Sequence, residues 1–381
     1  MTYDFDTPIN RRGTDCLKWD TCAEDVLPLP VADMDFVAPE PVLRALQERL
    51  NHGVFGYSCE PAELREVIVD RLWERYGWSV SPEALLFLPG VIAGFNLACR
   101  TTAPPGTGIL MQPPVYPPIL GSPANHGLRR LEAPLVRGDG GRYQVDWGAF
   151  DRLAAEAHLF ILCNPHNPVG RVFTRAELEQ MAEVCLRHDL TVCSDEIHCD
   201  VIFSGSHHMP LASVHPEIAR RTITLMAPSK TFNIPGIHCA FAVIPDADLR
   251  ERYAKARAGM VGAPGVLGYA AGLAAYRDGD EWLAQALAYI EANRDFLVEF
   301  VERRLPGVTV SPVEGTFLAW LDCRESGIEG SPAQFFLQKA RVALGDGAAF
   351  GKPGEGFARL NFACPRVTLT EGLDRMRAAL R

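Results

Sequence analysis

Short apolar runs alternate with helical patterns between residues 85 and 245, and this alternation limits the possible folds more than any other feature. The run 159–163 is apolar at every position, which is typical of a strand covered on both faces of a sheet. Strands joined through helices form parallel sheets by right-handed crossovers. The sequence therefore predicts an α/β fold with a mostly parallel sheet. The runs predicted as strands are 85–88, 108–112, 159–163, 190–193, 222–225 and 240–244.

Helices and a second, smaller unit are predicted on either side of this region. One helix is predicted to end at Gly53, and a second amphipathic helix follows the aromatic loop 54–58. A long helix over about residues 281–305 leads into a smaller α+β unit. The last helix of the chain is predicted to be capped by Thr368 and Glu371.

The size and charge of the chain exclude several classes of protein. Its 381 residues are enough for two or three domains. A net charge of −10 argues against a nucleic-acid-binding surface, which needs a basic face. No apolar run approaches the roughly 20 residues of a membrane span, and the chain does not start like a signal peptide, so we expect a cytoplasmic protein. The 11 cysteines lack CxxC spacing, so we expect reduced thiols and no metal site.

One lysine has neighbours that are unusual for a solvated side chain. Lys230 lies in the run 227–236, which consists mainly of small, apolar and turn-forming residues. Burial in such a run lowers the pKa of a lysine towards that of a nucleophilic amine, which suits carbonyl chemistry. The alternative is a lysine at a strand end that extends its charge to the solvent.

Other candidate site residues also follow predicted strands. Asn167 and Asp195 each come shortly after an apolar strand, as Lys230 does, and ligands of open α/β sheets bind at this edge. Tyr116 lies among four prolines, which hold it in a stiff loop after another strand. Gly90 starts a helix directly after a strand, and the unpaired amides of a helix start bind phosphate.

Together these residues match the needs of a pyridoxal phosphate site. Lys230 can form a Schiff base with the aldehyde of the cofactor. Asp195 can pair with a protonated pyridine nitrogen, which makes the cofactor an electron sink. Asn167 can donate to the ring oxygen, and Tyr116 can cover one face of the ring. The helix start at Gly90 can take the phosphate.

Arg359 adds a candidate contact for the substrate. It lies in a predicted strand of the C-terminal unit and can clamp a carboxylate with two donors. Each residue alone has a simpler explanation: Asp195 as a helix cap, Asn167 as a turn residue and Arg359 as a surface ion pair. A single bound cofactor accounts for all three residues together, and this favours a cofactor site.

Several motifs resemble those of a known family. Four of them resemble the fold-type I, class I and II aminotransferase superfamily: Asn-Pro-His-Asn-Pro-Val-Gly (164–170), Ser-Asp-Glu-Ile-His (194–198), Ser-Lys-Thr-Phe-Asn (229–233) and Arg-Leu-Asn-Phe-Ala-Cys-Pro-Arg (359–366). Three features resemble its cystathionine β-lyase, or C–S lyase, branch: Val-Ala-Asp-Met-Asp-Phe (31–36), His-Gly-Val-Phe-Gly-Tyr (52–57) and the histidine after Asp-Glu-Ile. The resemblance extends from about residue 16 to the C-terminus.

The resemblance implies a cofactor, an assembly and a set of site residues. It implies pyridoxal 5'-phosphate and a homodimer with active sites at the subunit interface, where Tyr57 reaches the phosphate of the partner's cofactor. It implies a large domain of residues 43–279 with a seven-stranded sheet, and a small α+β domain of residues 1–42 and 280–381. The catalytic residues that it implies are Lys230, Tyr116 and Asp195. The cofactor-binding residues are Lys230, Asp195, Asn167, Tyr116, His198, Val91, Ile92, Gly90, Ser229, Tyr57 and His238. The substrate-binding residues are Arg359, Asp33 and Tyr57.

The chain departs from the family pattern at three positions. Ala227 replaces a serine that commonly contacts the phosphate, and His238 stands where aminotransferases often have an arginine. Pro30 stands where the lyase branch often has a tryptophan near the substrate mouth. The loss of the arginine fits the lyase branch, and Pro30 points to a leaving group other than that of cystathionine.

The expected activity is α,β-elimination from L-cystathionine or a related cysteine S-conjugate, which gives a thiol, pyruvate and ammonia. Transamination uses the same residues, so an aminotransferase is one alternative, and a specialised C–S lyase of secondary metabolism is another. A regulatory or binding protein that keeps the fold without turnover is the alternative outside the enzymes, and the intact Lys230, Asp195 and Arg359 argue against it.

Overall fold

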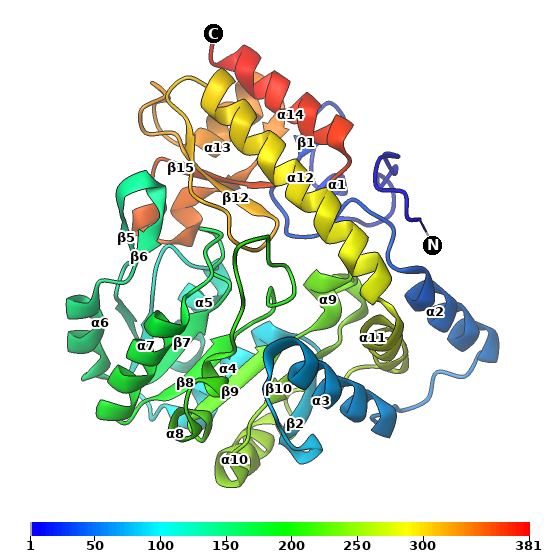
Figure 1. The fold of residues 1–381 in the computed structure, drawn as a ribbon, viewed down its shortest axis with the longest axis vertical. Coiled ribbons are helices and arrows are strands. Elements are labelled where there is room, and N and C mark those ends of the chain that lie inside the picture. Colours follow the sequence, from blue (N-terminus) through cyan, green and yellow to red (C-terminus); the bar gives the residue numbers. More distant parts are fainter. Residues whose placement is uncertain (1) are drawn as a thin grey trace.

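The computed structural model describes residues 2–381, and a seven-stranded sheet forms its centre (Figure 1). The strand order is β2-β10-β9-β8-β7-β3-β4. Only β10 runs antiparallel to its neighbours β2 and β9, so the predicted mostly parallel sheet is confirmed. The strands are β2 (Leu85–Leu88), β3 (Gly108–Met111), β4 (Arg129–Glu132), β7 (Ala157–Cys163), β8 (Thr191–Asp195), β9 (Thr222–Met226) and β10 (Ala240–Val243).

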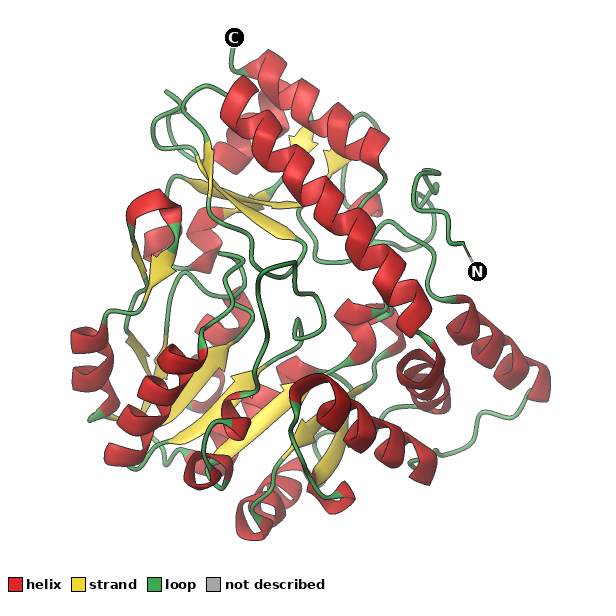
Figure 2. Cartoon of the chain, viewed as in Figure 1, coloured by secondary structure: helices red, strands yellow, loops and turns green. Residues whose placement is uncertain are grey.

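Helices cover both faces of this sheet, as the apolar run in β7 predicts (Figure 2). Successive side chains of a strand point to opposite faces. In β7, Phe160 and Leu162 therefore pack with α6 (Trp147–Ala154) and α7 (Arg175–Arg187). The alternate residues of the strand pack on the other face with α4 (Val91–Thr102) and α10 (Ala247–Arg257).

The ends of several helices follow from single residues. Helix α2 (Glu40–His52) ends at Gly53, which has a φ of +74° that favours glycine, as predicted. Helix α7 begins with a capping box in which the Thr174 hydroxyl accepts from the Glu177 amide and the Glu177 carboxylate accepts from the Thr174 amide. The predicted cap of the last helix is wrong. Helix α14 (Arg366–Ala379) begins directly after Pro365, so Thr368 lies inside its first turn and cannot cap it.

A smaller sheet forms a second layer near the C-terminus (Figures 1 and 2). Its strands are antiparallel in the order β11 (Thr309–Val310), β12 (Leu318–Asp322), β15 (Phe357–Asn361) and β14 (Gly345–Asp346). The long helix α12 (Asp280–Arg304) and α14 pack together beside it. Strand β1 (Leu27–Pro28) pairs with β13 (Val342–Ala343), which confirms a small α+β unit built from both termini. The exact domain boundaries stay predictions.

The remaining elements are mostly short and connect these layers. Helices α3 (Ala62–Tyr76) and α2 both pack against α11 (Val266–Asp278). None of the helices within residues 2–381 is long and apolar enough to cross a membrane. The short helices and the hairpin strands are α1 (Leu17–Asp20), α5 (Pro117–Gly121), α8 (Pro216–Ala219), α9 (Pro228–Thr231), α13 (Pro332–Phe335), β5 (Val136–Arg137) and β6 (Tyr143–Gln144).

Candidate active site

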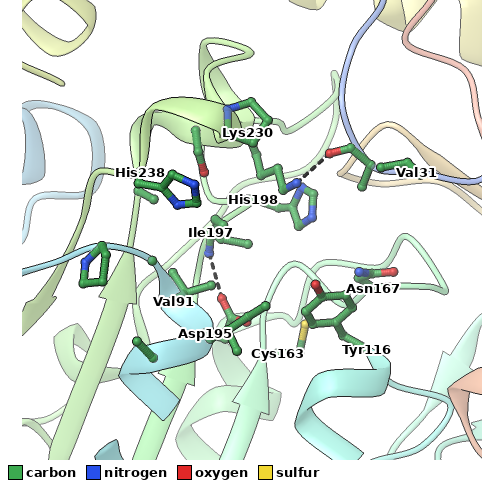
Figure 3. A pocket seen from close by; sticks show the side chains of 18 of the residues that line it. Val31, Val91, Tyr116, Cys163, Asn167, Asp195, Ile197, His198, Lys230 and His238 are labelled. Atoms are coloured by element: carbon green, nitrogen blue, oxygen red, sulfur yellow. Dashed lines mark hydrogen bonds between the residues drawn. The ribbon is translucent and has the colours of Figure 1, made fainter. Parts of the chain in front are cut away.

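A cavity of about 530 Å³ lies beyond the carboxyl ends of the parallel strands, between the large sheet and the smaller one. Most of the residues predicted for the site line this cavity, and Figure 3 shows how the central ones lie. The predicted residues that line it are Gly90, Val91, Ile92, Tyr116, Asn167, Asp195, His198, Ser229, Lys230, His238 and Arg359.

Lys230 lies on the short helix α9, which follows β9 directly, and its side chain extends into the cavity (Figure 3). The Nζ atom donates to the carbonyl oxygen of Ala32 at 2.6 Å. Burial lowers the pKa of Lys230 to about 8. The charge of Arg359 adds to this shift, and the carboxylates of Asp33 and Asp195 oppose it. About one tenth of the side chain is therefore an uncharged, nucleophilic amine at pH 7, far more than for a lysine in water.

Asp195 is the last residue of β8 and is buried in the cavity wall. Its Oδ1 accepts from the backbone amide of Ile197 at 3.2 Å. Burial raises the pKa of Asp195 to about 7, and the neighbouring charge of Glu196 adds to this shift. Within residues 2–381 the carboxylate has no ion-pair partner at salt-bridge distance. A protonated ring nitrogen would supply the missing positive charge, so the residue fits a pyridine cofactor.

Arg359 reaches the cavity from β15 of the smaller sheet. Its Nη1 donates to Oδ1 of Asn167 at 2.9 Å, and its Nη2 donates to the carbonyl oxygen of Pro30 at 2.6 Å. The guanidinium also lies over the ring of Phe350, while its buried Nε has no partner within the described residues. The guanidinium is thus held in one orientation with an unused donor, which suits a ligand carboxylate. Because the oxygen of Asn167 is engaged, its NH₂ group is available to a ligand.

Tyr116 and His198 are two uncharged polar groups of the cavity wall (Figure 3). Tyr116 precedes α5, and burial followed by the charge of Asp195 raises the pKa of its phenol. The ring of His198 packs edge-on against Phe317, and its buried Nδ1 has no partner in the described chain. Burial and then the charge of Lys230 lower the pKa of His198 to about 3, so the imidazole is neutral.

The start of α4 forms another part of the wall. Gly90 is its N-cap, and Val91, Ile92 and Ala93 of the first turn line the cavity. The first amides of a helix have no intrahelical partner and bind anions. A Cβ atom at Gly90 would meet no heavy atom within 4 Å, so the approach to these amides is open. This helix start fits a phosphate group.

Two predicted residues do not line the cavity of their own chain. The Oδ2 atom of Asp33 accepts from Nη2 of Arg11 at 2.6 Å, so its carboxylate is already engaged beside the cavity. Tyr57 is fully exposed on the loop between α2 and α3. Their proposed roles towards substrate and cofactor stay predictions.

The sequence did not predict the backbone roles of two cavity residues. The carbonyl groups of Pro30 and Ala32 hold Arg359 and Lys230, and no side-chain chemistry marks them. Carboxylates alternate with apolar residues at 33 and 35, and this pattern is the signal that could have found the segment. Arg11, which contacts both carboxylates, was not predicted.

Comparison with known proteins gives consistent matches over the whole length of the chain. The family model for class I and II aminotransferases matches residues 24–376. Cystathionine beta-lyase PatB of Bacillus subtilis is 39% identical over 385 residues, and the match covers 99% of each chain. The crystal structure of OvoB is 44% identical with a TM-score of 0.95 and 99% coverage of both chains. The pyridoxal-phosphate-bound C–S lyase of Staphylococcus hominis is 32% identical with a TM-score of 0.94, covering 100% of this chain and 98% of that one.

Proposed function

Since the chain belongs to the class I and II aminotransferase family, we propose that it is a pyridoxal-phosphate-dependent C–S lyase that cleaves a cysteine S-conjugate by α,β-elimination. Water enters the overall reaction, and a thiol, pyruvate and ammonia leave. The observation that carries the proposal is that Lys230, Asp195 and Arg359 converge on one cavity, each with an unmet charge or an unused donor. The similarity to PatB and to the C–S lyase of S. hominis supports elimination over transamination.

Several residues of the cavity would hold the cofactor. The carboxylate of Asp195 would pair with the ring nitrogen, the NH₂ group of Asn167 would donate to the ring oxygen, and the first turn of α4 would bind the phosphate. Ser229 and His238 line the same cavity and would add contacts to the phosphate. When bound, pyridoxal phosphate withdraws electrons from the substrate's Cα and so weakens its bond to hydrogen.

Residues of the chain bind the substrate and move its proton. Arg359 holds the substrate carboxylate through its unused donors, which fixes the position of Cα. The amine of Lys230 takes the Cα proton, because its lowered pKa leaves it partly uncharged. The electron pair left on Cα forms the double bond to Cβ as the C–S bond breaks, and sulfur leaves as a thiolate. The raised pKa of Tyr116 keeps its phenol neutral and able to donate a hydrogen bond in the same space.

Product analysis tests this proposal directly. The cofactor-loaded enzyme is incubated with cystathionine and a panel of other cysteine S-conjugates, without any keto acid. We expect free thiol and pyruvate in equal amounts, with the panel ranking the sulfur substituents. A strict requirement for a keto-acid acceptor would contradict the lyase and favour an aminotransferase.

The variant Lys230→Ala is the control for the site. We expect it to lose the visible absorption band of lysine-bound cofactor and at least about a thousandfold in the rate of thiol release, since it removes the group that moves the proton. A variant that keeps both would show that another group takes the proton.

A further inference from the structure

Residues 30–36, referred to here as the strap, connect the two cations of the active site. The strap lines the cavity through Pro30, Val31 and Ala32. The carbonyl of Ala32 accepts from Nζ of Lys230, and that of Pro30 accepts from Nη2 of Arg359, each at 2.6 Å. The orientation of both cations therefore depends on the position of this backbone.

Side chains of the surrounding elements fix the strap, because it has no helix or strand of its own. The Nδ2 atom of Asn361 donates to the carbonyl oxygens of Val31 and Asp33, each at 2.6 Å. The amide of Asn233 accepts from the backbone of Met34 and donates to two strap carbonyls, Met34 and Phe36. The inner side of the strap is thus held by two asparagines.

A cluster of charges holds the outer side of the strap. The guanidinium of Arg11 donates to Oδ1 of Asp35 and to Oδ2 of Asp33, each at 2.6 Å, and so bridges the two carboxylates. Asp35 also accepts from the buried Nζ of Lys18 at 2.7 Å and from Nε1 of Trp19 at 2.9 Å. Lys18 lies 3.7 Å from Oδ1 of Asp33, which is buried and has no hydrogen-bond donor among the described residues.

Arg11 contacts both carboxylates of the strap at 2.6 Å, whereas Lys18 is close only to Asp35 and lies 3.7 Å from Asp33. Without Arg11, Asp35 keeps Lys18 and Trp19, but Asp33 keeps only the longer contact to Lys18. Asp33 lies directly between Ala32 and Met34, so the loss of its contact with Arg11 loosens the part of the strap that holds Lys230, while Asn361 still bonds the carbonyls of Val31 and Asp33. Lysine cannot replace arginine here, because one ammonium group lacks the two-armed geometry.

We propose that Arg11 is a positioning residue for substrate binding. By bridging Asp33 and Asp35, it fixes the position of the strap relative to the cavity. Through the carbonyls of Pro30 and Ala32, the strap then orients Arg359 and Lys230. The N-terminal segment is therefore part of the active-site machinery, although it does not line the cavity. This inference rests on the proposed function only for the choice of ligand used to test it.

The chain supplies a matched control in the next residue. Arg12 belongs to the same segment, and its guanidinium donates to the carbonyl oxygens of Trp19, Cys22, Ala23, Glu24 and Val26. None of these carbonyls belongs to the strap. Arg12→Met therefore loosens the N-terminal segment, including Trp19, but keeps the bridge from Arg11 to Asp33 and Asp35, whereas Arg11→Met removes this bridge.

The experiment compares wild type, Arg11→Met, Arg11→Lys and Arg12→Met, each loaded with cofactor. The ligand is an α-methyl-substituted cysteine S-conjugate, which binds but has no Cα proton to lose, and its Kd is read from the visible spectrum of the cofactor. KM and kcat for the parent conjugate and the urea midpoint of each variant are measured in parallel.

For Arg11→Met we expect Kd and KM to rise about tenfold, the effect of a weakened charge-assisted hydrogen bond at Arg359, and kcat to fall as well, because the loosened strap also orients Lys230. Arg12→Met should lower the urea midpoint while Kd stays within about twofold. Equal effects of the two variants on Kd, or a Kd of Arg11→Met within twofold of wild type, would overturn the proposal.

Two further outcomes are covered by the same design. If Arg11→Met does not fold, the Kd of Arg11→Lys tests the proposal instead. A rise in Kd of at least about threefold supports the positioning role, and a smaller rise rejects it. If the wild type releases no thiol but the variants show the expected pattern of Kd, the proposed function fails and the role of Arg11 stands.

Discussion

Lys230 and Asp195 are buried in the same cavity, and burial shifts their pKa values towards each other, to about 8 and about 7. In both cases burial disfavours the charged form, which lowers the pKa of the amine and raises that of the carboxyl group. The two groups therefore carry less charge near neutral pH than they would in water. A cationic ring nitrogen beside Asp195 would restore the negative charge of that residue.

This shift predicts how the stability of the cofactor-free protein depends on pH. The folded Asp195 has a pKa of about 7 against an ordinary value of 3.8, so between these pH values the folded state holds a proton that the unfolded state has lost. The contribution of Asp195 to stability therefore falls as pH rises through this window. An asparagine side chain at this position would stay neutral throughout, and its oxygen could still accept from the Ile197 amide.

We therefore expect Asp195→Asn to gain stability relative to wild type by about 2 kcal/mol between pH 5 and pH 7. Urea unfolding of both cofactor-free proteins at several pH values within this range measures the difference. A stability difference that stays constant over the range would show that Asp195 does not titrate there.

Residue-level prediction from sequence succeeded for side chains whose chemistry is unusual for their neighbours. The predicted Lys230, Asp195 and Arg359 all line the cavity. They could be predicted because a charged group between apolar residues indicates a buried site. The sequence did not predict the backbone contacts of Pro30 and Ala32, because every residue carries a carbonyl group. The substrate contact of Asp33 stays a prediction. Its contact with Arg11 was not predicted, because no local pattern links residues so far apart in the chain.

At the scale of elements, the start of α4 is the part of the site that depends on a helix end rather than on a side chain. Val91 is the first residue of this helix, and its side chain is buried while the first turn faces the cavity. Proline is well tolerated at the first position of a helix, where the amide has no intrahelical partner. Val91→Pro therefore removes one N–H donor and keeps the helix.

If the first turn of α4 binds the cofactor's phosphate, Val91→Pro should weaken cofactor binding by about tenfold or more, the effect of losing one hydrogen bond to a charged group. Val91→Ala is the matched control, because it loses the same buried side chain but keeps the amide. Equilibrium dialysis of the cofactor with both variants gives the Kd values. Equal weakening in the two variants would place the phosphate elsewhere.

Most elements of the fold were predictable from the sequence, because the spacing of apolar residues and the residues at helix ends are local signals. Six strands of the large sheet and the end of α2 at Gly53 follow from such signals, whereas β4 was not predicted and the count of seven strands came from the family resemblance. The predicted cap of α14 was wrong, because Thr368 and Glu371 match a capping box while the helix already starts after Pro365, earlier in the chain. A proline at the helix start outweighed the weaker signal of the threonine.

At the scale of the whole molecule, a run of exposed apolar side chains covers α2 and the loop after it. This part of the chain projects from the edge of the molecule in Figure 1. Apolar side chains gathered on one exposed segment are typical of a protein–protein interface. The exposed residues are Val37, Leu43, Leu50, Val54, Phe55 and Tyr57. We propose that this surface joins two copies of the chain, so that Tyr57 completes the cavity of the partner subunit.

A shared active site makes a specific prediction for mixed dimers. Lys230→Ala and Tyr57→Ala each disable a homodimer, the first by removing the amine and the second by removing the phenol offered to the partner. In a mixed dimer, one site carries both changes and the other carries neither. Co-expression of the two chains should therefore restore roughly a quarter of wild-type thiol release, because half of the dimers are mixed and each of these has one intact site.

The control pairs Tyr57→Ala with the double variant Lys230→Ala, Tyr57→Ala. Every site then lacks the phenol of Tyr57, so mixing should restore nothing. Recovery in the first pair but not in the second requires Tyr57 to act across the interface, because a residue serving its own subunit leaves no intact site in either mixture. If the activity of the first mixture is only the average of its two parents, Tyr57 does not reach the partner's cavity and the exposed surface has another use.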